Sequence, residues 1–299
     1  MRYRRLGDLQ VGAIGLGAMP LSIEGHPDER QARATVHAAL DAGVTLIDTA
    51  DSYYAPGAEP GPGESLVARA LTAYRGDTDE VLVATKGGRG RTPDGDWTVN
   101  GDPRHLKRSA RDSLSRLGTE AIGLYQLHKP DPSVPFTDSL GALHDLLKEG
   151  TIRLAGISNV NTDQIRLARR MLGDRLVSVQ NRYSPAVRDS EAELRLCAEL
   201  GIAFLPWSPL GGISRSSLDG PSGPSVPGPC AAFHQVARSH GASPQQVALA
   251  WLLTQSPTVI PIPGSSRPRS IRDSAAAADL VLSESDLAEL DASGSQLTG

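Results

Sequence analysis

Short apolar segments alternate with amphipathic segments along nearly the whole chain, and this alternation limits the possible folds more than any other feature. The apolar runs that indicate buried strands begin near positions 15, 45, 81, 122, 152, 176, 202 and 258, with helical spacing of apolar residues between most of them. Composition stays uniform along the way. Eight strand–helix units in one uniform chain predict a single (β/α)8 barrel, the TIM-barrel fold, as one domain over residues 1–299.

The chain before the first unit has a different pattern. Tyr3–Leu6 and Val11–Ile14 flank the turn signal Gly7-Asp8, which predicts an N-terminal β-hairpin. A doubly wound sheet is the main alternative fold. It would carry Gly-x-Gly-x-x-Gly after its first strand, and the glycines near position 15 lack that spacing.

Charge and cysteine content exclude several classes of protein. The chain carries 30 basic and 34 acidic side chains, interspersed, so neither nucleic acid nor an anionic membrane is an expected partner. Its two cysteines, Cys197 and Cys230, form no CxxC and indicate neither a zinc cluster nor a disulfide framework. No signal peptide or membrane-spanning run is present, so a cytoplasmic protein is expected. The lack of an exposed apolar stripe favours a monomer.

Six of the predicted strands end on a side chain that can titrate, form hydrogen bonds or stack. These residues are Asp48, Lys86, His128, Asn159, Gln180 and Trp207. In a barrel of parallel strands, all the carboxyl ends open on one face, and active sites lie there. A purely structural barrel has no need for such residues at strand after strand. The pattern therefore predicts a functional site at this face.

Four of the residues in this region together suit proton transfer. Tyr53 lies on the loop five residues after Asp48. A phenol has a pKa near ~10, and the ammonium of Lys86 is expected to lower it, with Asp48 holding Lys86 charged and in place. His128 can orient a carbonyl oxygen or relay a proton. The set suits protonation of an oxyanion as a hydride arrives at its carbon.

Other interpretations of the same residues stay open. Lys86 and Asp48 could form a structural salt bridge, and His128 could be a turn histidine whose ring is satisfied locally. Asp48 and His128 could also join a further ligand around a metal ion, as in barrel hydrolases. No His-x-His and no second strand-end histidine accompany them, so no metal site is predicted. No Gly-x-Ser-x-Gly motif supports a serine hydrolase.

The remaining strand ends suit a cofactor. The amides of Asn159 and Gln180 match a carboxamide, and the flat face of Trp207 suits stacking on a ring. The segment 264–267, Gly-Ser-Ser-Arg, opens a helix and resembles an anion site at a helix N-terminus, with a basic surface loop as the other interpretation.

Seven short motifs, taken in order, resemble the aldo-keto reductase superfamily over essentially the full chain. They are Asp48-Thr49-Ala50-Asp51-Ser52-Tyr53, Val83-Ala84-Thr85-Lys86, Tyr125-Gln126-Leu127-His128, Gly156-Ile157-Ser158-Asn159, Val179-Gln180, Trp207-Ser208-Pro209-Leu210-Gly211 and Ile262-Pro263-Gly264-Ser265. Each motif is weak alone. All of them in order, on successive predicted strands, form a specific pattern.

The resemblance implies a fold and a reaction. The fold is a (β/α)8 barrel whose base is closed by the N-terminal hairpin, with NADPH bound in extended form and no Rossmann fold. The implied reaction is hydride transfer from NADPH to a small-molecule aldehyde or ketone, giving an alcohol. Tyr53 is then the proton donor, Lys86 and Asp48 tune it, and His128 orients the carbonyl. A non-catalytic or weakly catalytic NADPH-binding regulatory subunit of the same fold is the alternative.

The resemblance also implies where the nicotinamide end of the cofactor lies. Ser158, Asn159 and Gln180 are expected to hold the carboxamide, and Trp207 is expected to stack on the ring.

The rest of the cofactor is implied to extend away from the strand ends. Ser208 and Leu210 are expected to approach the pyrophosphate beneath the 211–229 loop. The length and the Gly/Pro/Ser content of the whole segment 208–229 suggest a functional lid. Ser265 and Arg267 are expected at the adenosine 2′-phosphate.

Two serines leave the choice of cofactor open. Ser270 and Ser274 stand where many members of the superfamily have an Arg and an Asn that grip the adenosine end, so NADH stays possible beside NADPH. The full expected cofactor set is Gly17, Ala18, Met19, Asp48, Ser158, Asn159, Gln180, Trp207, Ser208, Leu210, Gly264, Ser265 and Arg267.

The substrate pocket is expected on the loops above the strand ends. Met19, Tyr54 and Trp97 are its predicted lining, and Tyr54 offers a second phenol beside the proposed proton donor. The 87–101 loop, which contains Arg89, is polar enough to admit a sugar or a phosphorylated aldehyde such as pyridoxal phosphate.

Overall fold

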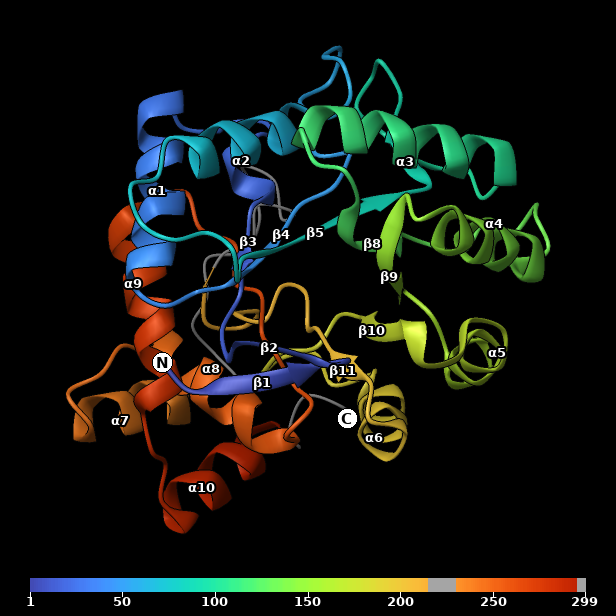
Figure 1. The fold of residues 1–299 in the computed structure, drawn as a ribbon. Helices are drawn as coiled ribbons and strands as arrows, with labels where there is room; N and C mark the ends of the chain where they lie inside the picture. The colour runs from blue at the N-terminus through green and yellow to red at the C-terminus, as the bar shows by residue number, and fades with distance from the viewer. Residues whose placement is uncertain (215–229, 295–299) are drawn as a thin grey trace.

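The computed structural model of the protein describes residues 1–214 and 230–294. Seven parallel strands in this part of the chain form one curved sheet, in the order β3-β4-β5-β8-β9-β10-β11, and the helices surround it (Figure 1). The strands are β3 (Leu16–Gly17), β4 (Leu46–Asp48), β5 (Leu82–Gly87), β8 (Ile122–Leu127), β9 (Ile152–Ser158), β10 (Leu176–Gln180) and β11 (Ala203–Phe204).

The segment 258–264 closes this sheet into a ring. It pairs in parallel with β11 on one side, through Phe204 and Val259, and with β3 on the other, through Gly17 and Gly264. Backbone hydrogen bonds of 2.9–3.0 Å accompany both pairings. The two prolines of this segment lack the N–H that a regular strand ladder needs, so it forms isolated bridges where the sequence predicts an eighth strand. The predicted (β/α)8 architecture is therefore confirmed.

Ten α-helices lie outside the sheet in the described part of the chain. They are α1 (Glu29–Asp41), α2 (Pro62–Thr72), α3 (Pro103–Leu117), α4 (Phe136–Glu149), α5 (Thr162–Leu172), α6 (Glu191–Leu200), α7 (Ala231–Ser239), α8 (Pro244–Gln255), α9 (Pro268–Ala276) and α10 (Glu284–Gly294), with 3₁₀ turns η1 (Met19–Leu21), η2 (Gly173–Arg175) and η4 (Ala277–Asp279). Their ends follow the sequence signals. In α3, Asp102 accepts a hydrogen bond from the His105 backbone N–H at 2.9 Å, and Gly118 ends the helix at φ 63°.

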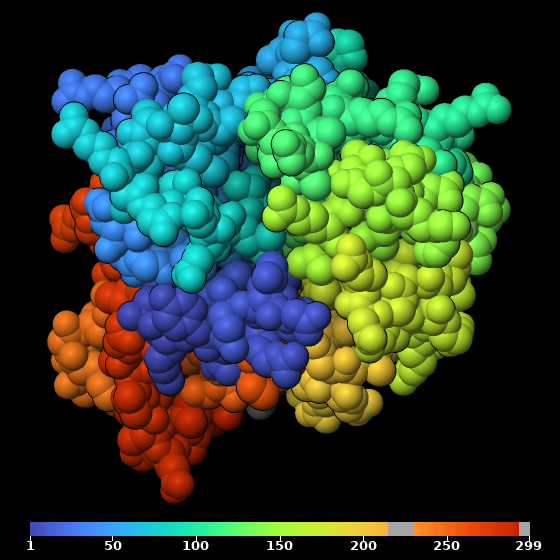
Figure 2. Space-filling model, in the orientation of Figure 1, coloured from blue at the N-terminus to red at the C-terminus, as the bar shows by residue number. Residues whose placement is uncertain are grey.

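The predicted N-terminal hairpin forms and closes the base of the barrel. Strands β1 (Tyr3–Leu6) and β2 (Leu9–Gly12) pair antiparallel. Leu6 is fully buried in an apolar cluster with side chains of the barrel interior. The other members of this cluster include Leu46, Leu82, Leu124, Val177, Leu205 and Ile260. At Gly7, where φ is +61°, a Cβ would lie 2.6 Å from a methyl group of Val177, so the turn packs directly on the barrel end. In Figure 2 the dark-blue N-terminal residues cover the middle of this face.

A second, smaller hairpin was not predicted. Within the 87–101 segment, β6 (Arg89–Arg91) and β7 (Trp97–Val99) pair antiparallel. The run Pro-Asp-Gly at 93–95 is a turn signal, and Trp, Thr and Val after it favour a strand. The charged residues of the first strand hide this pattern, because an amphipathic strand of three residues gives almost no periodic signal.

Two further sequence expectations concern the chain as a whole. The predicted functional loop over 208–229 lies mostly in residues 215–229, which are outside the described residues. Among the residues described, no helix combines the length and apolar character needed to cross a membrane.

The hairpin gives a test of the fold. Leu6→Ala should lower the free energy of unfolding by about 2–5 kcal/mol, because it leaves a cavity at the sealed base of the barrel. Leu9→Ala is the matched control on the same hairpin; Leu9 is 43% exposed, and its loss should change stability by less than about 0.5 kcal/mol. Urea unfolding followed by tryptophan fluorescence measures both. Equal effects of the two substitutions would show that the hairpin does not seal the barrel.

Candidate active site

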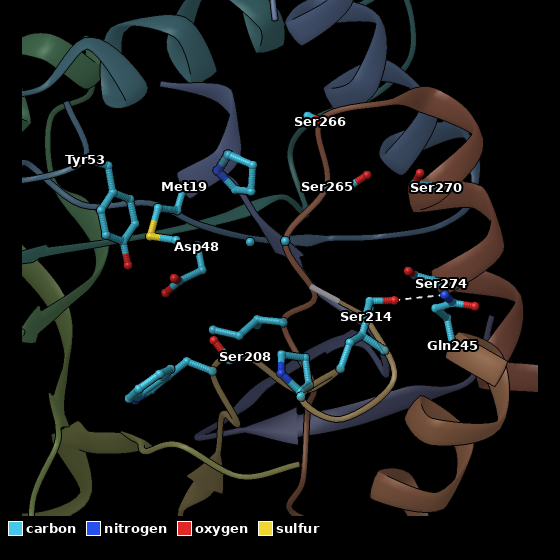
Figure 3. A pocket seen from close by; sticks show the side chains of 18 of the residues that line it. Met19, Asp48, Tyr53, Ser208, Ser214, Gln245, Ser265, Ser266, Ser270 and Ser274 are labelled. Carbon is cyan, nitrogen blue, oxygen red and sulfur yellow. Dashed lines mark hydrogen bonds between the residues drawn. The ribbon is translucent and has the colours of Figure 1, made fainter. Parts of the chain in front are cut away.

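The carboxyl ends of the strands meet in one large cavity of about 630 Å³. Most of the residues that the sequence predicts for the site line it. They are Gly17, Met19, Asp48, Tyr53, Trp97, His128, Ser158, Asn159, Gln180, Trp207, Ser208, Leu210, Gly264, Ser265 and Arg267. Figure 3 shows Tyr53, Met19 and Asp48 on one side of this space and Ser265, Ser270 and Ser274 on the other. The cavity is therefore elongated, with the candidate proton donor at one end.

A buried ammonium group connects the candidate catalytic residues. Lys86 is fully buried at the end of β5. Its Nζ donates to Asp48 Oδ1 at 2.5 Å, to the Thr49 carbonyl at 2.9 Å and to Tyr53 Oη at 3.1 Å. Burial acts to lower the pKa of Lys86, but the charges of Asp48 and Tyr53 and the hydrogen bonds to both outweigh it and raise that pKa. Lys86 is consequently a permanent cation behind the cavity wall.

The second oxygen of Asp48 is held by two amides. Gln126 Nε2 donates to Oδ2 at 3.1 Å and Gln180 Nε2 donates at 2.9 Å. Sequence reasoning assigned no role to Gln126. Residues two apart on a strand share a face, and Gln126 lies two residues before His128, so this alternation was the available signal.

The pKa of Tyr53 moves in the opposite direction from the one expected. Burial raises it, and this effect is larger than the lowering caused by the Lys86 ammonium. The charge of Asp48 raises it further, while Arg89 lowers it. The expectation of a lowered Tyr53 pKa is therefore wrong for the protein without a ligand, because burying a phenolate costs more than the ammonium returns. Tyr53 keeps its proton at neutral pH, as a proton donor must.

His128 is held neutral. Burial lowers its pKa well below the usual value of 6.5, and the nearby charges of Lys86 and Arg89 lower it further. Ser52 Oγ lies 3.2 Å from Nδ1, a contact that the sequence did not suggest. The imidazole meets the Tyr53 ring edge-on, with the centroids 5.6 Å apart. A neutral ring in this place can donate one N–H to an oxygen atom beside the Tyr53 hydroxyl.

The opposite wall of the cavity contains strained backbone. Asn159 and Ser208 have φ values of 59° and 48°, the two positive values among non-glycine residues in the described chain. The Asn159 side chain is fixed on both sides, since it accepts from Trp207 Nε1 at 3.2 Å and donates to the His128 carbonyl at 2.9 Å. Such strain persists only where the surroundings enforce it, and it is concentrated at functional sites.

Gln180 has one polar atom left for a ligand. Its Nε2 is committed to Asp48, and its backbone carbonyl accepts from Ser158 Oγ at 2.6 Å. Among the described residues none donates to its Oε1, and the side chain lines the cavity. The residue can therefore accept one hydrogen bond from a bound amide.

The far end of the cavity is formed by the start of α9. Its lining there includes Ser265, Ser266, Arg267, Arg269, Ser270 and Ser274, together with Ser243, Gln245 and Asp273, which the sequence did not indicate. Ser265 Oγ donates to the Arg267 carbonyl at 3.1 Å, which shapes the turn into the helix. In Figure 3, Gln245 and Ser214 are joined by a hydrogen bond of 2.8 Å beside this end.

Two predicted residues lie elsewhere. Ala18 is buried, does not line the cavity and donates its backbone N–H to the Asp48 carbonyl at 2.8 Å. Tyr54 lines a separate cavity of about 410 Å³, and its hydroxyl accepts from the Arg91 backbone N–H at 3.1 Å. Tyr53 is thus the phenol of the main cavity, and the expected place of Tyr54 in the substrate pocket is not supported. In residues 1–214 and 230–294, no three His, Cys, Asp or Glu side chains are grouped as metal ligands.

Comparison with known proteins agrees with this geometry. The profile of the aldo/keto reductase family matches residues 13–294, nearly the whole chain. The chain belongs to the aldo/keto reductase family. The resemblance inferred from the seven motifs is thereby confirmed.

Individual relatives match nearly the full length of this aldo/keto reductase. An uncharacterised oxidoreductase of Schizosaccharomyces pombe is 35% identical over 294 residues, which are 97% of this chain and 89% of that protein. Pyridoxine 4-dehydrogenase of Escherichia coli is 34% identical over 297 residues, 96% of each chain. The crystal structure of an aldo/keto reductase from Klebsiella pneumoniae in complex with NADP and acetate gives a TM-score of 0.76 at 28% identity, over 97% of this chain and 94% of that one.

The buried ion pair of this aldo/keto reductase predicts a large stability effect. Lys86→Met should lower the free energy of unfolding by about 3–5 kcal/mol, because it leaves the Asp48 carboxylate buried without its cation. Lys107 and Asp145 form the matched surface pair, with side chains 26% and 50% exposed, and Lys107→Met should cost less than about 1 kcal/mol. Urea unfolding at pH 7 compares the two. Similar losses would mean that the Asp48 site is hydrated.

The neutral state of His128 predicts a pH dependence. The imidazole pKa is lower in the folded than in the unfolded protein, so the unfolded chain binds the extra proton as pH falls below about 6.5. The free energy of unfolding should therefore fall between about pH 6.5 and 5 more steeply for the wild type than for His128→Asn. The two slopes should differ by up to about 1.4 kcal/mol per pH unit. Unfolding curves at several pH values measure the two slopes. Parallel slopes would contradict a neutral buried imidazole.

Proposed function

We propose that this aldo/keto reductase reduces the carbonyl group of an aldehyde or ketone to an alcohol, with NADPH as hydride donor and Tyr53 as general acid. One observation carries the proposal. The Tyr53 hydroxyl lies 3.1 Å from the buried Lys86 ammonium, on a side chain that lines the main cavity. A phenol held against a cation and open to a cavity is placed to give its proton to an oxygen atom there.

The donor set of the cavity fits a nicotinamide dinucleotide. At the Tyr53 end, the free Gln180 Oε1 suits a carboxamide N–H and the Trp207 indole offers a flat face for a ring. At the α9 end, Arg267 and Arg269 with several serine hydroxyls suit phosphate groups, and the arginines favour the additional phosphate of NADPH over NADH. When bound, this group supplies the hydride.

Lys86 and Asp48 support the proton transfer. Burial makes a Tyr53 phenolate costly, and the Lys86 ammonium lowers that cost at the moment when the proton leaves. Asp48 in turn keeps Lys86 charged and fixes its position through the 2.5 Å contact. The two residues therefore act on the acid strength of the phenol in the transition state, without touching the substrate.

His128 is assigned to orient the carbonyl. If Ser52 donates to Nδ1, the neutral ring carries its proton on Nε2, which is then free to donate into the cavity. An oxygen atom that accepts from His128 and from Tyr53 at once has its carbon fixed relative to the cofactor face. Because the pKa of His128 is low, this role does not require protonation at neutral pH.

Removing the proton donor is the direct test. Tyr53→Phe should reduce kcat for carbonyl reduction by about 10²–10⁴-fold, since a general acid contributes that much. NADPH affinity should change by no more than about twofold, because the phenol oxygen is not needed for cofactor binding. NADPH oxidation with pyridoxal and a panel of small aldehydes gives kcat, and quenching of tryptophan fluorescence gives the affinity.

Tyr54→Phe provides the matched control. It removes the neighbouring phenol oxygen, which lies in the separate cavity against Arg91. Turnover should stay within about threefold of wild type, as for a substitution outside the reacting groups. Retained turnover in Tyr53→Phe, or equal losses in both variants, would reject Tyr53 as the acid.

A further inference from the structure

Arg89 is placed beside the candidate reaction site by the small β6–β7 hairpin. In this hairpin Arg91 lies opposite Trp97, and Arg89, two residues earlier, shares its face. The Arg89 guanidinium carbon lies 4.3 Å from the centroid of the Trp97 ring. Trp97 packs in turn against the cluster that contains Tyr53, and Arg89 and Trp97 both line the main cavity. Arg89 also lines the separate cavity that contains Tyr54, so the hairpin places a cation at the border of the two cavities, one of which contains the proposed proton donor.

Arg91, the other arginine on this face of the hairpin, has a structural role. Arg91 forms an ion pair with Glu24 at 2.5 and 2.8 Å and donates to the carbonyl groups of Gly95 and Tyr54. Its side chain is only 7% exposed. Arg91 thus anchors the hairpin to the rest of the protein, and its charge is fully compensated.

Arg89 has none of these partners. In the described residues it forms no hydrogen bond, and no carboxylate lies within 4.0 Å of it, although its Nε is buried and bonded to nothing. The two terminal nitrogens of Arg89 also form no hydrogen bond in the described residues, but unlike Nε they keep accessible surface. Burial lowers the pKa of Arg89, yet an arginine stays charged in proteins. A half-buried guanidinium without a counter-ion has lost hydration and gained only stacking on Trp97 in return.

The fork of N–H groups on a guanidinium matches the paired oxygens of a carboxylate or a phosphate. We propose that Arg89 binds an anionic group, a carboxylate or a phosphate, on the carbonyl substrate, while the carbonyl oxygen lies at Tyr53 and His128. This inference rests on the proposed function and names the class of substrate. The anionic oxygens complete the hydrogen bonding of Arg89, and Trp97 holds the guanidinium plane in place. Substrates are then selected by charge at a fixed distance from the carbonyl.

A purely electrostatic role for Arg89 is the competing explanation. Its charge lowers the pKa of both Tyr53 and His128. Loss of that effect would reduce kcat equally for every carbonyl substrate and shift the pH profile. Loss of a binding contact would instead raise KM for anionic substrates alone. Matched pairs of substrates therefore separate the two roles.

The test uses two aldehyde pairs that differ only in the anionic group. They are 3-carboxybenzaldehyde with its methyl ester, and glyceraldehyde 3-phosphate with glyceraldehyde. In at least one pair, the wild type should have a kcat/KM for the anionic aldehyde about tenfold or more above that for its neutral partner. Arg89→Met should abolish this preference by raising KM for the anionic aldehyde. The pair that responds identifies carboxylate or phosphate as the source. Arg104→Met removes the same charge from the exposed surface of α3 and should leave the preference unchanged.

A binding measurement keeps the inference testable without turnover. In the presence of NADP⁺, isophthalate should bind the wild type about tenfold more tightly than benzoate, since its second carboxylate reaches Arg89. In Arg89→Met the ratio should fall to about twofold, the statistical advantage of two equivalent groups. The role of Arg89 alone would be overturned if the enzyme reduced neutral aldehydes, showed no preference for the anionic members and bound isophthalate no more tightly than benzoate. No reduction of any aldehyde would overturn the proposed function, while the isophthalate ratio still decides about Arg89.

Discussion

The buried pair of Lys86 and Asp48 is the interaction on which the rest of the site depends. Burying two ions costs several kcal/mol each, and their attraction offsets this only when their remaining donors and acceptors are also satisfied. The three N–H groups of Lys86 have three acceptors, and one of these is the Tyr53 hydroxyl. The phenol is therefore positioned by the same requirement that stabilises the pair. Any change that loosens the pair also moves the Tyr53 hydroxyl.

Closure of the barrel is what makes this network possible. In the sheet, β4 and β10 are separated by three intervening strands, so a flat sheet would place them about 19 Å apart. Gln180 at the end of β10 nevertheless donates to Asp48 at the end of β4, at 2.9 Å. The contact exists because the sheet curls until its inward side chains meet. Asp48 thus receives hydrogen bonds from side chains on three other strands of the barrel, β5, β8 and β10, and its position depends on the closed ring.

Much of the fold and most of the site were predictable from the sequence, because both depend on patterns that repeat. Strand ends such as Lys86 and His128 are visible as polar residues after apolar runs. Gln126 was missed because its role depends on a partner 78 residues earlier in the chain. The pKa of Tyr53 was predicted in the wrong direction because its burial depends on packing across several loops. The sequence marks the loop of Arg89 only as polar enough for a sugar or a phosphorylated aldehyde, because it cannot show which arginine of that loop lacks a partner.

The distribution of charge in the cavity is opposite to that of the whole chain. The protein carries a net charge of −4, but the carboxylates that line the cavity are already engaged, Asp48 by Lys86 and two amides and Asp273 by Ser243 and Gln246. The arginines that line the cavity are not engaged in this way. Arg89, and Arg267 and Arg269 at the far end, have no carboxylate partner among the described residues. A partly closed space lined by such groups attracts anions and stabilises an oxyanion that forms within it. Burial lowers the pKa of His128 well below its usual value, and the charges of Lys86 and Arg89 lower it further. The imidazole is therefore neutral, which is the form needed if the histidine is to orient a carbonyl without competing for the proton of Tyr53.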